Sequence, residues 1–196
     1  FNKPNVEAGV AALAMLRIGL CYKGGVMWKM QAGMGDVIFG PIYELLKQRG
    51  VKFKFFHQLT NLSAGQTDQG EPQVSEIELC QQVSLVGQDY EPLIDVKQLP
   101  CWPSEPLYEQ ISPEQAHLLQ EYQINLESFW SNWPEVYQEH FSTPLPTVTL
   151  RHGIDFDTLI LGVSVASLEH VASELLAVDY ALSQQATKVQ SVATQA

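Results

Sequence analysis

Two glycine-containing turns are the parts of this sequence whose residue types best fit chemistry. The first is G-M-G-D-V-I at residues 33–38, between an expected strand and an expected helix. There, a G-x-G-x-x-G motif brings a pyrophosphate to the helix N-terminus. Ile38 replaces the third glycine, and residues 52–66 contain no Asp or Glu that could hold a ribose hydroxyl. The residues therefore favour a structural turn over primary dinucleotide binding, and contact with a ligand stays open.

The second turn is G-V-S-V-A at residues 162–166, which is similar to the G-x-S-x-G nucleophile elbow. In a hydrolase of that kind the serine, here Ser164, is followed in the chain by an acid and then a histidine. Here His170 comes before Asp179, so a triad would need upstream residues such as His152 and Asp155. A serine hydrolase is therefore an alternative that the order of the residues disfavours.

Metal and disulfide chemistry have no support in the spacing of ligand-type side chains. The histidines form no HExxH or other i, i+4 pair, and we expect no metal site. Asp155 and Asp157 could chelate a cation, but a solvated strand entrance is the favoured interpretation. The three cysteines form no CxxC pair, which indicates a reducing compartment and a cytoplasmic location. Cys101 and Trp102 either line a pocket or pack under a loop, and both interpretations stay open.

The composition excludes several classes of protein. Of the 196 residues, 45% are hydrophobic and 17% are charged, so the chain can bury a core and is not disordered. No apolar stretch approaches the roughly 20 residues of a membrane-spanning helix, so we expect no membrane span. With 11 basic and 22 acidic residues the formal charge is −11, and a nucleic acid would repel the molecule.

The charge is unevenly distributed along the chain. Residues 1–60 hold eight basic and three acidic side chains, a charge of +5, so the other residues carry −16. A basic first third could face phosphates, although mutual neutralisation within one fold is favoured. The chain starts at Phe1 without an initiator Met or signal segment and stops within a polar stretch, so we expect a piece of a longer protein.

The first third of the chain predicts a strand, turn, helix, strand unit. An apolar run at 6–20 predicts a largely buried helix, and V-M-W-K-M-Q at 26–31 predicts a short strand. A helix follows over 36–48, with Asp36 as N-cap, Gly50 just past its end, and a regular part that begins near Gly40 because of Pro41. Alternation of Val51, Phe53 and Phe55 with lysines predicts a strand over 51–62.

The rest of the chain predicts further strands and helices in a mixed α/β fold. Pro113 at the first helical position, after Ser112 as N-cap, predicts a helix to about Trp130. The continuous apolar run at 157–163 is typical of a buried central strand. The other expected segments are a polar loop at 63–72, strands at 74–85 and 91–98 joined by a turn at 87–89, proline-rich breaks at 100–113 and 134–146, and an amphipathic helix at 167–182.

Several of these stretches together resemble FAD-dependent oxidoreductases of the flavin-containing amine oxidase and phytoene desaturase type. In those proteins a glycine-rich turn and helix lead into a strand ending in V-x-x-I, matched here by L-T-N-L at 59–62. A meander and then a strand of the type A-D-x-V-V-L-A-x-P-x-x-x-L follow, matched here by residues 156–168. The resemblance is most specific at 22–62 and 151–168.

The resemblance implies a fold, a cofactor and four site residues. The fold would be a fragment of an FAD/NAD(P)-binding fold with a β-meander. Residues 1–89, with the strand-helix-strand unit, would be part of the FAD-binding and substrate domains, and 90–147 would be a helical insertion of substrate-domain character. Residues 148–196 would be the return strand and helix of the FAD-binding domain. Leu59 matches the strand residue whose backbone meets the adenine, and Gly162, Val163 and Ser164 match the turn near the dinucleotide.

The activity that the resemblance implies is hydride transfer from a small organic substrate to the flavin of FAD. The G-x-G-x-x-G motif would lie before Phe1 and the closing flavin-binding motif after Ala196, so we expect residues 1–196 alone to be inactive. No catalytic residue can be assigned. The alternative is a non-catalytic α/β binding or scaffold module that uses the Pro- and Trp-containing segment 100–134 as an interaction surface.

Overall fold

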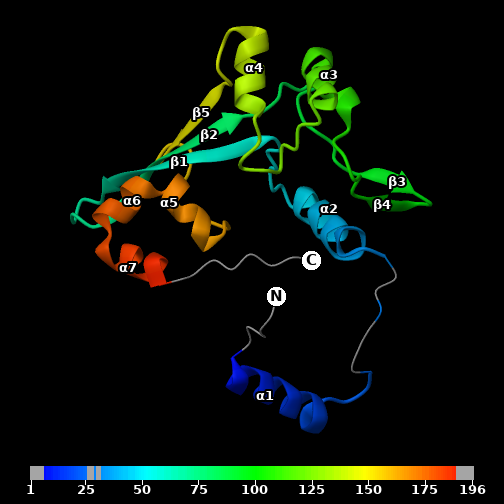
Figure 1. Cartoon of the computed structure of the whole chain (residues 1–196), viewed down its shortest axis with the longest axis vertical. Helices are drawn as coiled ribbons and strands as arrows, with labels where there is room; N and C mark the ends of the chain where they lie inside the picture. The colour runs from blue at the N-terminus through cyan, green and yellow to red at the C-terminus, as the bar shows by residue number, and fades with distance from the viewer. Residues whose placement is uncertain (1–6, 26–28, 30–31, 189–196) are drawn as a thin grey trace. The chain divides into compact units, whose positions relative to one another are not determined.

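The computed structural model describes residues 7–25, 29 and 32–188. The fold is mixed α/β with a small antiparallel sheet, whose elements Figure 1 labels. The chain divides into two compact units. Phe1–Val51 with Leu93–Ser104 form the helix–hairpin unit, and Lys52–Pro92 with Glu105–Ala196 form the sheet unit. The division into residues 1–89, 90–147 and 148–196 that the resemblance implies stays a prediction.

The sheet unit is organised around three antiparallel strands in the order β1-β2-β5. These are β1 (His57–Gln66), β2 (Pro72–Gln81) and β5 (Thr147–Arg151). The short helices α5 (Leu168–Val171) and α6 (Ser173–Val178) lie along β1, as Figure 1 shows, and α7 (Tyr180–Lys188) follows. The buried residues between strands and helices, here called the sheet core, are Leu62, Ile77, Val171 and Ala172.

A second core lies in the same unit under α3 (Pro113–Glu121) and α4 (Trp133–Phe141), with the 3-10 turn η3 (Tyr108–Gln110) beside α3. Trp133 is 1% exposed there, and its indole N–H donates to the Gln82 carbonyl at 2.7 Å. The buried Gln115 side-chain oxygen accepts from the Ser84 N–H at 2.7 Å. Because these buried polar groups are paired, the core carries little desolvation cost. This helical core consists of Val83, Ile111, Ala116, Leu118, Leu119, Trp133, Tyr137 and Leu145.

The helix–hairpin unit begins with α1 (Ala8–Leu16) and a π-helical turn η1 (Arg17–Cys21). A second π-helical turn, η2 (Gly35–Phe39), leads into α2 (Gly40–Gln48). The hairpin consists of β3 (Ile94–Val96) and β4 (Leu99–Cys101). Its two turn residues, Lys97 and Gln98, have φ angles of 56° and 66°, as a two-residue turn of the type I′ class requires.

Several expected elements are confirmed. The regular helix α2 begins at Gly40 and stops before Gly50, whose φ of 85° is the left-handed conformation expected just past a helix end. Strand β2 overlaps the strand predicted at 74–85, although it begins earlier, at Pro72, and ends at Gln81. Helix α3 follows Ser112 and starts at Pro113, but it stops at Glu121 instead of reaching Trp130. The strand expected at 26–31 falls, apart from Lys29, outside the described residues.

The strand expected at 51–62 is confirmed only from His57 onward, and the strand expected at 157–163 is wrong. Phe56 has a φ of 57°, which breaks the extended chain, so β1 begins at His57 and the alternating residues 51–55 lie outside it. The apolar run at 157–163 is not a strand, because it pairs with none of the described strands. Leu159 and Leu161 nevertheless pack against the sheet core, while Ile160 is 91% exposed. An apolar run therefore buries alternate residues here without joining the sheet.

The remaining differences concern boundaries and burial. β1 runs through Gln66 where a loop was expected, and the strand expected at 91–98 is only β3. Helix α4 and strand β5 occupy the segment around the expected break at 134–146, because Pro134 sits in the first turn of α4, where proline is tolerated. The helix expected at 167–182 is three short helices.

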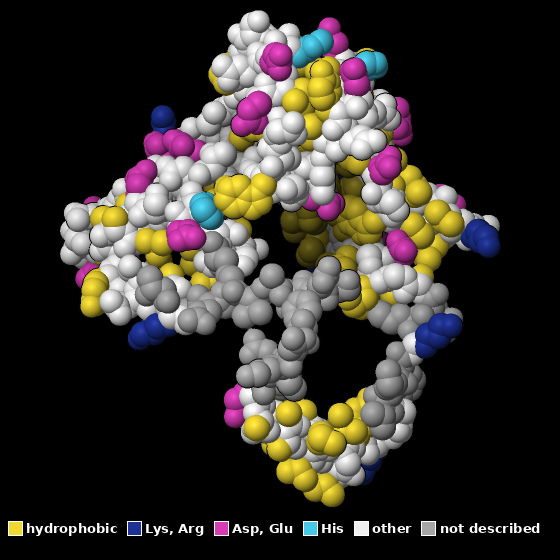
Figure 2. Space-filling model, in the orientation of Figure 1, with side chains coloured by type: hydrophobic (Ala, Val, Ile, Leu, Met, Phe, Trp, Pro, Cys, Tyr) yellow, Lys and Arg dark blue, Asp and Glu magenta, His cyan; other side chains and the backbone are white. Residues whose placement is uncertain are grey.

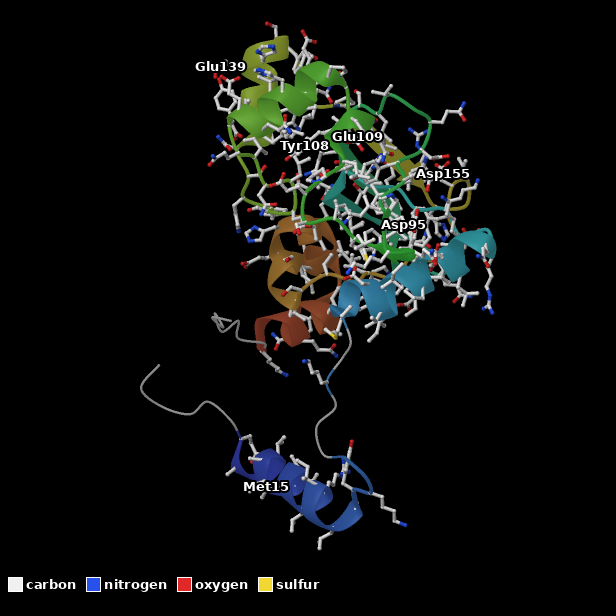
Figure 3. The ribbon with its side chains drawn as sticks, turned by 90° about the vertical axis from the view of Figure 1, so that its right-hand side faces the viewer. Met15, Asp95, Tyr108, Glu109, Glu139 and Asp155 are labelled. Atoms are coloured by element: carbon white, nitrogen blue, oxygen red, sulfur yellow. The ribbon has the colours of Figure 1, made fainter. Side chains whose placement is uncertain are left out.

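The burial expected for the first helix is also wrong. No residue of α1 is buried, and Met15 projects from it with 75% of its surface exposed (Figure 3). Glu7 caps α1 by accepting hydrogen bonds from the N–H groups of Gly9 and Val10, which lowers the pKa of its carboxyl. Among the described helices, none is long and apolar enough to cross a membrane.

Candidate functional site

Leu59, the expected adenine contact, lies near the start of β1. Its partner across the antiparallel pair is Leu79 of β2, and its half-buried side chain packs against the sheet core. The pairing shifts between Leu59 and Asn61, which leaves Thr60 exposed with its hydroxyl donating to the Glu78 carbonyl at 3.0 Å. Such an irregularity bends a strand and is frequent beside functional sites.

Gly162, Val163 and Ser164 form an exposed segment between the half-buried Leu161 and the 3-10 turn η4 (Val165–Ser167). Ser164 is extended, with φ −60° and ψ 141°, and its carbonyl accepts from the Ser167 N–H at 2.9 Å. A Cβ added at Gly162 would meet no heavy atom within 4 Å. The segment therefore presents its backbone to solvent with open space beside it.

These two parts of the expected site come together on one core. Leu59 from β1 packs against the sheet core, and so do Leu161 and Leu168, which flank the exposed segment 162–164. Because Leu161 and Leu168 are anchored there, the segment between them is held at the surface of the same unit. The structure thus brings the two separate sequence stretches onto one packed framework.

The described residues form no catalytic triad of the kind that the serine hydrolase alternative requires. Ser164 lies in the exposed segment, whereas the His152 Nε2 atom is 3.2 Å from the Asp157 carbonyl oxygen. The Asp155 carboxylate accepts a hydrogen bond from the Arg151 N–H at 2.8 Å. No hydrogen bond joins Ser164 to either side chain, so the elbow-like sequence lacks the relay that would activate a nucleophile.

The first glycine-containing turn has a structural role in the helix–hairpin unit. The Asp36 Oδ1 atom accepts a hydrogen bond from the Trp102 backbone N–H at 3.0 Å, and the Trp102 ring lies edge to face with Tyr43 at 5.4 Å. A Cβ at Gly35 would lie 3.4 Å from the Trp102 Cδ1 atom. This turn therefore receives the end of the hairpin, a contact that the sequence did not indicate.

Cys101, next to Trp102, is half-buried. Desolvation and the nearby Asp36 carboxylate raise the pKa of its thiol. A thiol with a raised pKa is less reactive than an ordinary one. In the part of the chain that the structure describes, no group of three His, Cys, Asp or Glu side chains could hold a metal ion.

Phe129 and Trp130, which were not singled out from the sequence, form an exposed aromatic cluster with His170 in the sheet unit. Phe129 and Trp130 are perpendicular with centroids 5.0 Å apart, and Trp130 is perpendicular to His170 at 5.3 Å. Phe129 and His170 are 5.7 Å apart. The adjacent pair F-W in the segment 100–134 was the available signal, but its contact with His170 depends on the fold.

The cluster is connected to both stretches of the expected site. The Gln58 side-chain amide donates to the Phe129 carbonyl at 3.5 Å, and Gln58 is the residue before Leu59 in β1. His170 belongs to α5, which follows η4 and the segment 162–164. A carboxylate oxygen of Glu169 lies 3.7 Å from the His170 Nε2 atom.

The sheet unit carries most of the negative charge of the molecule. Within Lys52–Pro92 and Glu105–Ala196 the sequence has 4 Lys and Arg against 18 Asp and Glu, a net of −14. Figure 2 shows acidic side chains distributed over the visible face of this unit. A ligand of this unit would be held by ring stacking and backbone contacts more than by charge attraction to an anion.

No family model, no curated protein and no solved structure matches the chain.

Proposed function

We propose that the chain is part of an FAD-dependent oxidoreductase similar to the flavin-containing amine oxidases and phytoene desaturases. Such an enzyme passes a hydride from a small organic substrate to the flavin. In this proposal residues 1–89 and 148–196 belong to an FAD-binding fold, and 90–147 are an insertion of substrate-domain character. The support from the sequence is the resemblance at residues 22–62 and 151–168.

The single observation that carries the proposal is the shared packing of Leu59 and Leu161. Both side chains contact the sheet core, although they come from stretches far apart in the sequence. The resemblance assigns the adenine contact to Leu59 and a contact near the dinucleotide to the segment that begins right after Leu161. Shared packing holds these two positions in one unit, which is what a single bound dinucleotide requires.

The exposed backbone of both stretches fits such a ligand. Among the described strands β1 is at the edge of its sheet, so one side of its backbone is not paired with another strand. Backbone N–H and C=O groups at an edge can bond to a heterocycle. The room beside Gly162 lets a ligand approach the backbone at that residue, which has no side chain.

In the proposed enzyme the chemistry belongs to the cofactor and the positioning to the protein. Bound FAD supplies the hydride acceptor, its flavin N5 atom. The residues of this chain would hold the dinucleotide through the β1 edge and the segment 162–164. Because the sheet unit is acidic and would repel the pyrophosphate, another part of the complete protein would bind that group. The resemblance implies the same, since it assigns the G-x-G-x-x-G motif to a segment before Phe1.

The experiment is purification of the protein from the complete natural reading frame that contains residues 1–196. We expect a yellow protein with oxidised-flavin absorption, and FAD released on denaturation and identified by its mass. A colourless protein that stays colourless after incubation with FAD would overturn the proposal and would favour the binding or scaffold module. Replacement of Ser164 by Ala should leave any esterase activity unchanged, because no triad reaches that serine.

A further inference from the structure

The aromatic cluster has the features of a binding surface for a flat ring. Trp130 is 76% exposed and Phe129 is 42% exposed, whereas Trp133, three residues later, is 1% exposed. Neighbouring exposed apolar side chains form a candidate binding surface, whereas single exposed apolar residues are normal. The two perpendicular contacts of Trp130 fix its ring while three quarters of its surface stays free.

The place of the cluster in the fold identifies which ring would lie there. Gln58 connects the Phe129 backbone to β1 directly beside Leu59. His170 connects the cluster to the helix that follows the segment 162–164. The cluster therefore joins the two stretches that the proposed function places along one dinucleotide, at the Leu59 end assigned to the adenine.

The charge of the surroundings agrees with a neutral ring. A net charge of −14 on the sheet unit repels phosphate, and Glu169 lies beside His170. Adenine is uncharged at neutral pH and stacks on indole rings through its π-face. Stacking is therefore the interaction available to a dinucleotide at this surface.

We infer that Trp130 is an adenine-binding residue that stacks on the adenine of FAD, supported by Phe129 and His170. This inference rests on the proposed function. It adds a third contact to those expected at Leu59 and at residues 162–164. It also gives the segment 100–134 a role in cofactor binding instead of protein interaction.

The test uses the full-length protein, its apoprotein and titration with FAD. Removal of one stacking partner should weaken FAD binding by roughly 5- to 150-fold in Trp130→Ala. Trp130→Phe keeps a π-face and should restore most of the affinity. The visible spectrum of bound flavin should stay unchanged in both variants, because the ring contacted is the adenine. Tyr122→Ala, which removes another aromatic side chain, 55% exposed, should bind FAD as the wild type does.

Three results would overturn the inference. One is wild-type FAD affinity in Trp130→Ala. Another is a weakened affinity together with an altered flavin spectrum, which would place Trp130 against the isoalloxazine ring. The third is an equal loss in Tyr122→Ala, which would indicate a general effect on the fold. Each of these requires a wild-type protein that binds FAD, whereas a wild type without flavin contradicts the proposed function itself.

Discussion

The Asp36 carboxylate accepts a hydrogen bond from the Trp102 backbone N–H at 3.0 Å, and this contact joins the start of the η2–α2 helix to the end of the β3–β4 hairpin. The two residues lie far apart in the sequence, so the bond closes the helix–hairpin unit. Tyr43 adds an edge-to-face contact with the Trp102 ring. The turn that looks like a phosphate-binding motif is therefore occupied by the chain itself.

Asp36→Ala should destabilise the helix–hairpin unit by about 1–3 kcal/mol, because a half-buried N–H loses its charged acceptor. Asp36→Asn keeps an acceptor oxygen and should lose less. Amide hydrogen exchange at Trp102, measured together with urea unfolding, checks this prediction. Unchanged exchange at Trp102 in Asp36→Ala would show that the bond does not hold the hairpin.

Gly65→Ala should destabilise the sheet, because a Cβ at Gly65 would lie 2.7 Å from the Ser75 Cβ atom on the adjacent strand. We expect a loss of about 1–3 kcal/mol in the free energy of unfolding. The matched control is the double variant Gly65→Ala with Ser75→Gly, in which the clash is absent. Denaturant unfolding of both single variants and the double variant should give a favourable coupling energy. Simple additivity would argue against the close approach of β1 and β2.

Trp133→Phe should lower the free energy of unfolding by about 2–4 kcal/mol, because the Gln82 carbonyl loses its donor and a cavity is left in the helical core. Trp130→Phe is the matched control, since Trp130 is 76% exposed, and should change stability little. Thermal and denaturant unfolding of both variants measures the difference. Equal losses in the two variants would contradict the assignment of core and surface.

The three cysteines should react with iodoacetamide at different rates. Burial raises the pKa of the Cys80 thiol, and desolvation with the nearby Asp36 carboxylate raises that of Cys101, whereas Cys21 is exposed. A raised pKa lowers the thiolate fraction near neutral pH, so Cys80 and Cys101 should react slowly at pH 7 and faster as the pH rises. Peptide mass spectrometry after timed alkylation provides the rates. Modification of Cys80 as fast as Cys21 at neutral pH would be the contrary result.

Local signals predicted the regular part of α2, because its boundaries depend on its own residues. The expected N-cap is wrong, since Asp36 lies within η2 and accepts its hydrogen bond from Trp102. Pro41 must lie in a first helical turn, and Gly50 supplies the left-handed residue past the end. The same local chemistry predicted the start of α3 at Pro113. Where a turn or cap decides a boundary, the sequence is sufficient.

Tertiary contacts decided the elements that were predicted incorrectly. Nothing local indicates that Phe56, a bulky residue, takes a φ of 57°, yet this turn lets its ring pack edge to face against Tyr90 at 4.8 Å. The apolar run at 157–163 predicts a buried strand, but only the alternate residues Leu159 and Leu161 pack against the sheet core. Periodicity describes which residues are buried and does not say whether a hydrogen-bonded partner strand exists.

The candidate site could be predicted only in part from the sequence, because tertiary contacts bring its residues together. Leu59 and residues 162–164 came from a resemblance in sequence, and their shared core became visible only in the fold. The aromatic cluster depends on His170 meeting a loop that lies before α4, a long-range contact that no spacing rule predicts.

Hydrogen exchange of the full-length protein with and without FAD tests the central claim most directly, because it reports both stretches at once. We expect FAD to protect amides in β1 around Leu59 and in residues 162–164 together, while the helical core around Trp133 exchanges as before. A protein that binds FAD without slower exchange in either stretch would contradict the account.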